Sequence, residues 1–374
     1  MRFSGKPVLG RAGSAVFAVL FAMLLSACAS RPGPDALATV DSPPGARLVK
    51  IFVATNRARL EPDTNIFTNH KSPTLNFAEF TIAIPPDHRS GRVGLPGVPG
   101  DGAFVVVAQR VLTGPEFLAA VKRFEAGRGQ QDITLFVHGY NNNFQESLFR
   151  LAQVSADSRI DSAQILFAWP SHASVAGYVA DKDAVMYSRD HLAALLTGLT
   201  ENLGKRRIRL AAHSMGAQLA METLRTLRLA GRDDVIRRAD VVLAAPDIDV
   251  EVFSQQLRVV GPLTPPMKIL VAKDDRALRV SGLLASSLGR VGAVDIEDSR
   301  VQEAVVRARV QVIDISELQS ADGLGHDRFV YLAGLYPQLA RRPALSHAGV
   351  FLLDAAGAIV TAPLHTELLN AAAD

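Results

Sequence analysis

The chain has 374 residues, 48% of them apolar, which is enough to bury the core of one large domain or two small ones. Its formal charge of +3 comes from 40 basic and 37 acidic residues, and three of the basic ones, Arg2, Lys6 and Arg11, stand near the amino terminus with no acid beside them. The remaining charges cancel and form no block rich in lysine or arginine, so we expect no nucleic-acid partner.

The amino-terminal residues have the pattern of an export signal. The basic residues are followed by an apolar run over 15–25 that is too short to span a bilayer as a stable helix. Leu25-Ser26-Ala27-Cys28 then resembles the lipobox of bacterial lipoproteins, in which the signal is cut before the cysteine and its thiol receives a diacylglycerol. We predict a lipoprotein signal peptide over 1–27 and a lipid anchor on Cys28. The alternative is an ordinary secretory signal that happens to contain a cysteine.

The segment after the predicted anchor indicates a tether in the cell envelope. Cys28 is the only cysteine, so a disulfide within the chain is impossible. Residues 28–47 hold four prolines and little apolar material, which predicts a flexible tether. Ala29 stands where an aspartate favours inner-membrane retention in enteric-type sorting. By that analogy we expect a protein anchored in the outer membrane and facing the periplasm.

A folded domain is expected over 48–340, and it opens with antiparallel strands. Residues 49–54, 77–84 and 104–108 have strand composition and are separated by turns rich in proline and glycine. From residue 133 onward, continuous apolar strands alternate with amphipathic helices, which is typical of a parallel sheet covered on both faces. The predicted strands are 133–137, 163–168, 208–212, 241–244, 269–272 and 310–314, and the predicted helices are 144–155, 187–203, 217–230 and 249–257. The tail, 341–374, has no assigned structure apart from a strand-like piece at 349–353.

Ser214 lies in a segment that predicts a nucleophile elbow. Ala212-His213-Ser214-Met215-Gly216 runs from a strand through a tight turn into a helix. Small residues flank the serine of such an elbow because the turn brings backbone against backbone, and the following amide points at the developing oxyanion. Ala212 stands where the motif G-x-S-x-G has its first glycine. The alternative is a serine that only caps the helix.

A serine nucleophile needs a base. In proteins with a nucleophile elbow, the base follows both the serine and the acid along the chain. The histidines after Ser214 are His326, His347 and His365. His326 follows the last predicted core strand, so we predict that it is the base, whereas the other two lie in the unassigned tail. A surface histidine without a role is the alternative for each.

Carboxylates follow two successive predicted strands at the edge of the sheet where ligands bind. One loop holds Asp247 and Asp249, and the next holds Asp274 and Asp275. The acid usually follows the penultimate strand, which favours the second loop, and the three-residue spacing from Ala272 favours Asp275. Asp247 remains the alternative acid, and helix capping or solvation is the alternative role for all four.

The loop after the first parallel strand is expected to complete an oxyanion hole. In His138-Gly139-Tyr140, the amide of Tyr140 would converge with that of Met215 on one oxygen. His138 precedes the serine and is similar to the supporting histidine of lipase loops, which is not a base. The single tryptophan, Trp169, follows the next strand, where it either walls an acyl pocket or packs in the core.

Seven motifs in a fixed order resemble a bacterial α/β-hydrolase family of unknown function within the esterase and lipase superfamily. They are VATNR (53–57), IPPDH (84–88), FVHGYN (136–141), WPS (169–171), AHSMG (212–216), APD (245–247) and DRAL (275–278). The resemblance spans about residues 50–332. It implies the α/β-hydrolase fold and a Ser-His-Asp triad, and it names no substrate.

We therefore expect a serine hydrolase that cleaves carboxylic esters of small molecules or lipids through an acyl-enzyme, with neither a metal ion nor an organic cofactor. The same triad also supports amide hydrolysis or acyl transfer. An alternative from another class is an envelope binding protein with an inert hydrolase fold.

Overall fold

The computed structural model describes residues 31–96, 102–126, 128, 132–285, 289–320 and 322–333, and the backbone of two short strands near the carboxyl terminus. The strands are β1 (Arg47–Arg59), β2 (Phe67–Ile84), β3 (Val105–Leu112), β4 (Ile133–Val137), β5 (Gln164–Ala168), β6 (Ile208–His213), β7 (Ala239–Ala244), β8 (Lys268–Val271), β9 (Gln311–Asp314), β10 (Phe351–Leu353) and β11 (Ile359–Val360). The helices are η1 (Pro34–Leu37), α2 (Gly114–Glu125), α3 (Phe144–Ser158), η2 (Val175–Gly177), α4 (Tyr178–Asn202), α5 (Met215–Leu229), α6 (Asp233–Ile236), α7 (Val250–Val260), α8 (Arg276–Leu284), η3 (Val291–Ala293) and α9 (Ser299–Ala308).

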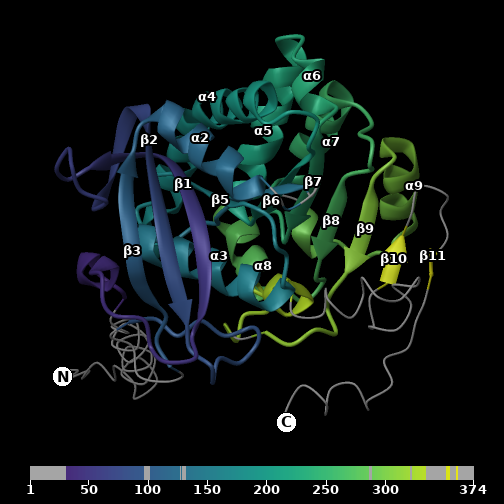
Figure 1. Ribbon diagram of the computed structural model, residues 1–374. Helices are drawn as coiled ribbons and strands as arrows, with labels where there is room; N and C mark the ends of the chain where they lie inside the picture. Colours follow the sequence, from purple (N-terminus) through teal and green to yellow (C-terminus); the bar gives the residue numbers. More distant parts are fainter. Residues whose placement is uncertain are drawn as a thin grey trace, which may run out of the picture.

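Within the described residues the strands form one 11-stranded sheet in the order β11-β10-β9-β8-β7-β6-β4-β5-β1-β2-β3 (Figure 1). The centre, from β1 through β5 and β4 to β9, is parallel. At one end β1, β2 and β3 pair antiparallel, and at the other β10 pairs antiparallel with β9 and β11. The predicted fold class, a mostly parallel sheet with an antiparallel start, is confirmed.

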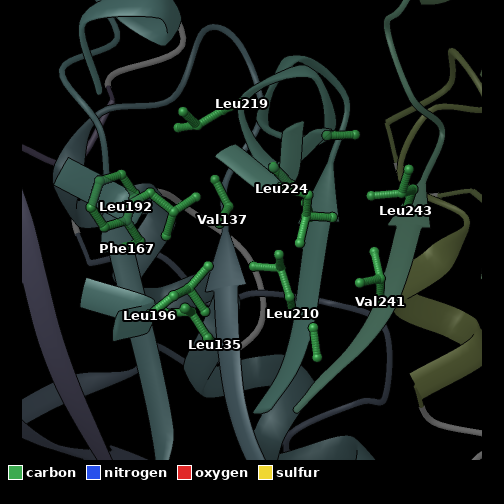
Figure 2. Close-up of a cluster of buried hydrophobic side chains, with 14 of the residues drawn as sticks. Leu135, Val137, Phe167, Leu192, Leu196, Leu210, Leu219, Leu224, Val241 and Leu243 are labelled. Carbon is green, nitrogen blue, oxygen red and sulfur yellow. The ribbon is translucent and has the colours of Figure 1, made fainter. Parts of the chain in front are cut away.

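Helices cover both faces of the sheet. One face packs against α2, α4, α5, α7 and α9, and the other packs mainly against α3. Figure 2 shows leucines of α4 and α5 pointing onto the central strands. The labelled residues from the two helices and from the strands beneath them are Leu135, Val137, Phe167, Leu192, Leu196, Leu210, Leu219, Leu224, Val241 and Leu243. Side chains of β4 and β5 are buried along their whole length because both faces are covered, which explains their largely apolar sequences.

The described part of the predicted tether, residues 31–47, makes contacts with the domain. Leu37 is 2% exposed and joins the core cluster on the α3 side of the sheet. The N–H of Val40 donates to the carbonyl of Val106 in β3 at 3.0 Å. The physical reason is that Leu37 gains burial against this cluster, which outweighs the local preference of the prolines for an open segment.

Among the helices in the described ranges, none has the length and hydropathy that a bilayer crossing requires. The predicted signal peptide and Cys28 lie outside the described residues. Of the predicted tail, 351–353 and 359–360 are strands at the end of the sheet, and the first of them falls within the strand-like piece at 349–353.

Candidate active site

Ser214 occupies a strained turn between β6 and α5. Its backbone has φ +54° and ψ −123°, a conformation that L residues rarely adopt. Gly216 makes the turn possible, because a Cβ there would lie 2.3 Å from the carbonyl oxygen of His138. Such strain concentrates at functional sites, and it holds the serine at the carboxyl edge of the sheet as a nucleophile elbow does.

The loop after β4 passes directly against this turn. A Cβ on Gly139 would lie 3.0 Å from the Cβ of Ser214 and 2.8 Å from Nδ1 of His213, so only glycine fits. Tyr140 follows in this loop, and Met215 begins α5, where the first amides have no partner within the helix. The fold thus brings the loop that holds Tyr140 and the first turn of α5 together at Ser214.

His138 and Trp169 lie beneath this loop. Trp169 is fully buried, its indole N–H donates to the carbonyl of His138 at 2.8 Å, and the two rings stack with centroids 4.9 Å apart. Burial, and then the positive charge of Arg57, lower the pKa of His138 to about 3. His138 is therefore neutral near pH 7 and supports the loop. Of the two roles expected for Trp169, the structure has the packed one.

Arg57, from the first of the seven motifs, is a buried cation under the same loop. Its side chain donates to the carbonyl of Asn142 at 3.1 Å, and only 2% of the residue is exposed. Burial lowers its pKa to about 10, against the opposing effect of Asp181 and Glu146. The sequence marked this residue as part of a motif but gave no signal of its position.

His326 and Asp275 meet at the carboxyl edge of the sheet. Nδ1 of His326 lies 2.7 Å from Oδ2 of Asp275, whose other oxygen accepts the N–H of Leu278 at 3.0 Å and caps α8. Asp275 is fully buried and follows β8, and His326 follows the neighbouring strand β9. The two loops thus bring the predicted base and the favoured acid into contact.

Further contacts clamp the two loops together. Arg328 forms a bidentate ion pair with Asp274 at 2.6 and 2.7 Å, and the N–H of Arg276 donates to the carbonyl of Leu324 at 2.9 Å. Asp322 accepts the N–H groups of Leu324 and Gly325, which shapes the turn before His326. Asp274 is thus engaged by Arg328, which leaves Asp275 to face the histidine.

The surroundings of His326 raise its pKa above the ordinary value of 6.5. Burial acts in the opposite direction, but the hydrogen bond to Asp275 and the negative charges of Asp275, Asp322 and Asp247 outweigh it. The carboxylate thus favours the imidazolium form, which is the form that a general base reaches after it takes a proton.

His213, for which the sequence predicted no role in the site, positions the loop of His326. Its Nε2 lies 3.1 Å from the carbonyl oxygen of His326, and the two rings are 4.6 Å apart. Burial, and then the charge of His326, lower the pKa of His213 well below 6.5, so it is neutral and donates to that carbonyl. Since His213 precedes Ser214, this contact places the loop of His326 next to the elbow.

The alternative acid, Asp247, belongs to a separate buried cluster. Its carboxylate accepts from Ser281 at 2.7 Å and from Tyr178 at 3.0 Å, and it pairs with Nε of Arg290 at 3.1 Å. Its backbone N–H donates to the carbonyl of Ser214 at 3.2 Å. Asp247 therefore supports the elbow from below while its carboxylate is engaged elsewhere.

The remaining candidate residue within the described ranges is Asp249. Asp249 caps α7 by accepting from the N–H of Glu251 and Val252. His347, His365 and Cys28 lie outside the described residues.

Comparison with known proteins identifies the family of this chain. Solved structures with a partial likeness include a fungal esterase from Rhizomucor miehei (12% identity, 90% of this chain and 100% of that chain covered, TM-score 0.30) and esterases from Pyrobaculum calidifontis (12%, 91% and 96%, 0.32) and Pseudomonas putida (13%, 88% and 91%, 0.32). These TM-scores are low. Curated proteins give no significant match. Residues 118–342, more than half of the chain, match the family described as alpha/beta hydrolase of unknown function (DUF900). The chain therefore belongs to this family of α/β hydrolases.

Proposed function

We propose that the protein is a serine hydrolase that cleaves carboxylic esters through an acyl-enzyme. The observation that carries this proposal is the 2.7 Å contact between His326 and Asp275 at the edge of the sheet where Ser214 occupies its strained turn. The combination of a nucleophile at a tight turn, a histidine and a buried carboxylate that orients it supports acyl transfer by a triad.

Each step of the reaction is assigned to a residue. Oγ of Ser214 attacks the ester carbonyl while Nε2 of His326 takes its proton, and Asp275 accepts the hydrogen bond from Nδ1 and stabilises the imidazolium. The N–H groups of Tyr140 and Met215 donate to the tetrahedral oxyanion. The C–O bond then breaks as His326 returns the proton to the leaving alcohol. Water, deprotonated by His326, then attacks the acyl-enzyme, and His326 returns this proton to Oγ of Ser214 as the C–O bond breaks and the acid is released.

A series of p-nitrophenyl esters tests the reaction class. We expect hydrolysis of the short soluble esters, with slower or no cleavage of the matching aminoacyl amides. Faster cleavage of the amides would favour an amidase on the same triad, and ester formation with added alcohols would favour an acyltransferase. No turnover of either series by the folded protein would favour an inert binding protein.

The raised pKa of His326 predicts a specific pH dependence. The base must be neutral to accept a proton, so kcat/KM for a soluble ester should fall as the pH drops through a pKa above 6.5. Asp275→Asn removes the charge and the hydrogen bond that raise this pKa, and the acid limb of the residual activity should move to lower pH. An acid limb that does not move in this variant would mean that another group is titrating.

We further propose that Cys28 carries a lipid anchor in the cell envelope, with the domain facing the periplasm from the outer membrane. Cys28→Ala should abolish incorporation of labelled palmitate and leave the signal peptide uncleaved. Cys28→Ser should give the same loss. This variant keeps the size of the side chain and removes only the thiol, so it shows that the thiol is what the anchor requires. Normal palmitate labelling of either variant would contradict the anchor, and recovery of the wild-type protein in inner-membrane fractions would contradict the location.

A further inference from the structure

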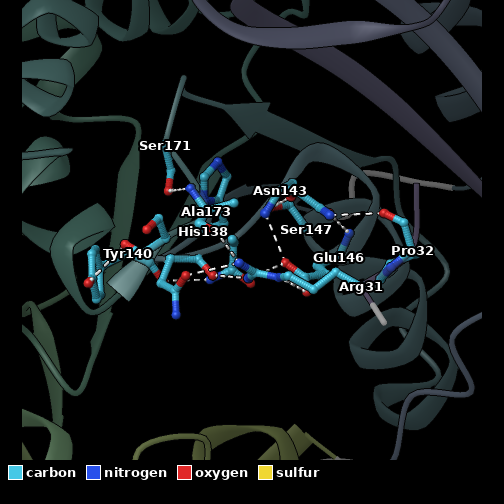
Figure 3. A network of polar contacts seen from close by, with 12 residues as sticks. Arg31, Pro32, His138, Tyr140, Asn143, Glu146, Ser147, Ser171 and Ala173 are labelled. Atoms are coloured by element: carbon cyan, nitrogen blue, oxygen red, sulfur yellow. Dashed lines mark hydrogen bonds and ion pairs between the residues drawn. The ribbon is translucent and has the colours of Figure 1, made fainter. Parts of the chain in front are cut away.

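The amino-terminal end of the described chain is held beside the candidate oxyanion loop. Arg31 binds the carboxylate of Glu146 through two nitrogens, at 2.7 and 2.8 Å, and donates to Oδ1 of Asn141 at 3.0 Å. It also donates to the backbone carbonyls of Asn141 and Ala173. Figure 3 shows Arg31 and Pro32 beside Asn143 and Glu146. The chain therefore enters the domain at the carboxyl edge of the sheet, where Ser214 lies.

This entry point limits the distance between the candidate active site and the proposed anchor. Cys28 precedes Arg31 by three peptide steps. Three residues span at most about 11 Å in any conformation. A diacylglycerol on Cys28 would thus hold Asn141 and its loop close to the surface of the bilayer, with the carboxyl edge of the sheet turned toward the lipid.

Apolar side chains are exposed on the same edge. Val175 and Val179, at η2 and the first turn of α4, are each 76% exposed, and Leu283 and Leu284 of α8 are 81% and 65% exposed. Leu324, two residues before His326, is 48% exposed. We call these five side chains the apolar rim. A contiguous patch of exposed apolar side chains marks a site of interaction with a protein or a membrane.

Contacts in the structure tie both parts of the rim to the candidate site. The hydroxyl of Tyr140 donates to the carbonyl of Val175, which places η2 against the candidate oxyanion loop. Tyr178, beside Val179, and Ser281, in the same helix as Leu283, donate to the two carboxylate oxygens of Asp247. The rim therefore has a fixed position on either side of the Asp247 loop. In Figure 1 the arrowheads of β8 and β9 point toward the end of the sheet where α8 lies.

We propose that the apolar rim docks on a phospholipid bilayer and that the substrate is a lipid ester drawn from that bilayer. This inference rests on the proposed function and on the anchor at Cys28. Apolar side chains at a membrane surface enter the boundary between headgroups and acyl chains by about 5–10 Å, and they add to the binding that one lipid anchor gives. The short link from Cys28 to Arg31 turns the rim, and with it Ser214, toward the ester groups of the lipid.

The experiment uses the full-length acylated protein in vesicles of phosphatidylethanolamine and phosphatidylglycerol. Release of fatty acid from the vesicles is compared with hydrolysis of p-nitrophenyl butyrate in solution. In Val179→Asp/Leu283→Asp the vesicle rate should fall by about tenfold or more, since two apolar contacts with the lipid are replaced by charges, while the soluble rate stays within about twofold of the wild type.

Leu229→Asp is the matched control. Leu229 is 63% exposed and ends the 15-residue helix α5, which begins at Met215 directly after Ser214 and so carries Leu229 about 22 Å away from the elbow. This variant should keep both rates. Melting temperatures of all variants check that the fold is intact.

A second variant tests the short link. An insertion of about twelve glycine and serine residues between Ala29 and Ser30 adds roughly 20 Å of reach and should lower the vesicle rate without changing the soluble rate.

Equal vesicle rates in the wild type, the rim variant and the insertion variant would overturn the inference, and so would a wild type without activity on vesicles that hydrolyses the soluble ester. A shift from dimer to monomer in the rim variant would also overturn it, because the rim would then be a protein interface. A wild type without activity on either substrate would instead contradict the proposed function.

Discussion

Ser214→Ala should lower kcat for a p-nitrophenyl ester by about 10⁴- to 10⁶-fold, because it removes the proposed nucleophile. His326→Ala should cause a loss of similar size. The double variant should lose no more than the larger single loss, since members of a triad act as a unit and their effects are not additive.

The structure indicates that the serine variant keeps its fold. The side chain of Ser214 makes no capping hydrogen bond to α5, and alanine at this position meets the same backbone conformation as serine. The melting temperature of Ser214→Ala should therefore stay close to that of the wild type. Activity within about tenfold of the wild type in a folded Ser214→Ala protein would contradict the assignment of the nucleophile.

Asp275→Asn should lower kcat by about 10⁴-fold while the protein stays folded. Asparagine keeps the oxygen that accepts the N–H of Leu278, so the cap of α8 is preserved. It loses the negative charge that stabilises the imidazolium of His326 and selects the tautomer with hydrogen on Nδ1. The kinetic loss should consequently appear without a matching loss of stability.

Asp247→Asn is expected to show the opposite behaviour. Arg290 is 4% exposed, and this substitution leaves its charge buried without a carboxylate. Removing one partner of a buried ion pair costs about 3–5 kcal/mol of stability, so the melting temperature should fall clearly. The fraction that remains folded should turn over substrate within about tenfold of the wild type. If folded Asp247→Asn is inactive while Asp275→Asn retains most of its activity, the acid belongs to the earlier loop.

The sequence predicted the central sheet well because its strands are apolar on both faces. Strands such as β4 and β7 have continuous apolar runs, so their positions can be read from composition alone. Strand β2 was harder. The first half of β2, before Phe77, is largely polar because most of its side chains are exposed or half-buried. The predicted strand therefore began at residue 77, ten residues after the start of β2.

Helices were predicted less completely where their amphipathic pattern is weak or short. Helix α4 begins at Tyr178, whereas the predicted helix began at residue 187. In its first turn the apolar Val179 is exposed and the charged Asp181 is buried, so this turn lacks the apolar spacing by which a helix is recognised. Helix α2 was not predicted, although Thr113 and Glu116 form a capping box at its start. That signal was present in the sequence.

In the candidate site, too, the residues with a local sequence pattern could be predicted and the others could not. Ser214 and His326 could be placed from local signals, since a strand, a tight turn and a loop after the last core strand are sequential features. The choice between Asp274 and Asp275 depends on Arg328, which is distant in the chain and removes Asp274 from consideration by pairing with it. His213 and Arg57 act through backbone carbonyls of other loops, and such contacts leave no pattern in the sequence.

Covalent labelling with a fluorophosphonate tests the central proposal most directly. The probe reacts with a serine only when a base and an oxyanion hole activate it, and the labelled peptide identifies the residue by mass spectrometry. We predict a single adduct on Ser214 in the wild-type protein, and its absence in His326→Ala and in protein unfolded by urea. A folded wild-type protein that remains unlabelled, or an adduct on another serine, would contradict the proposed active site.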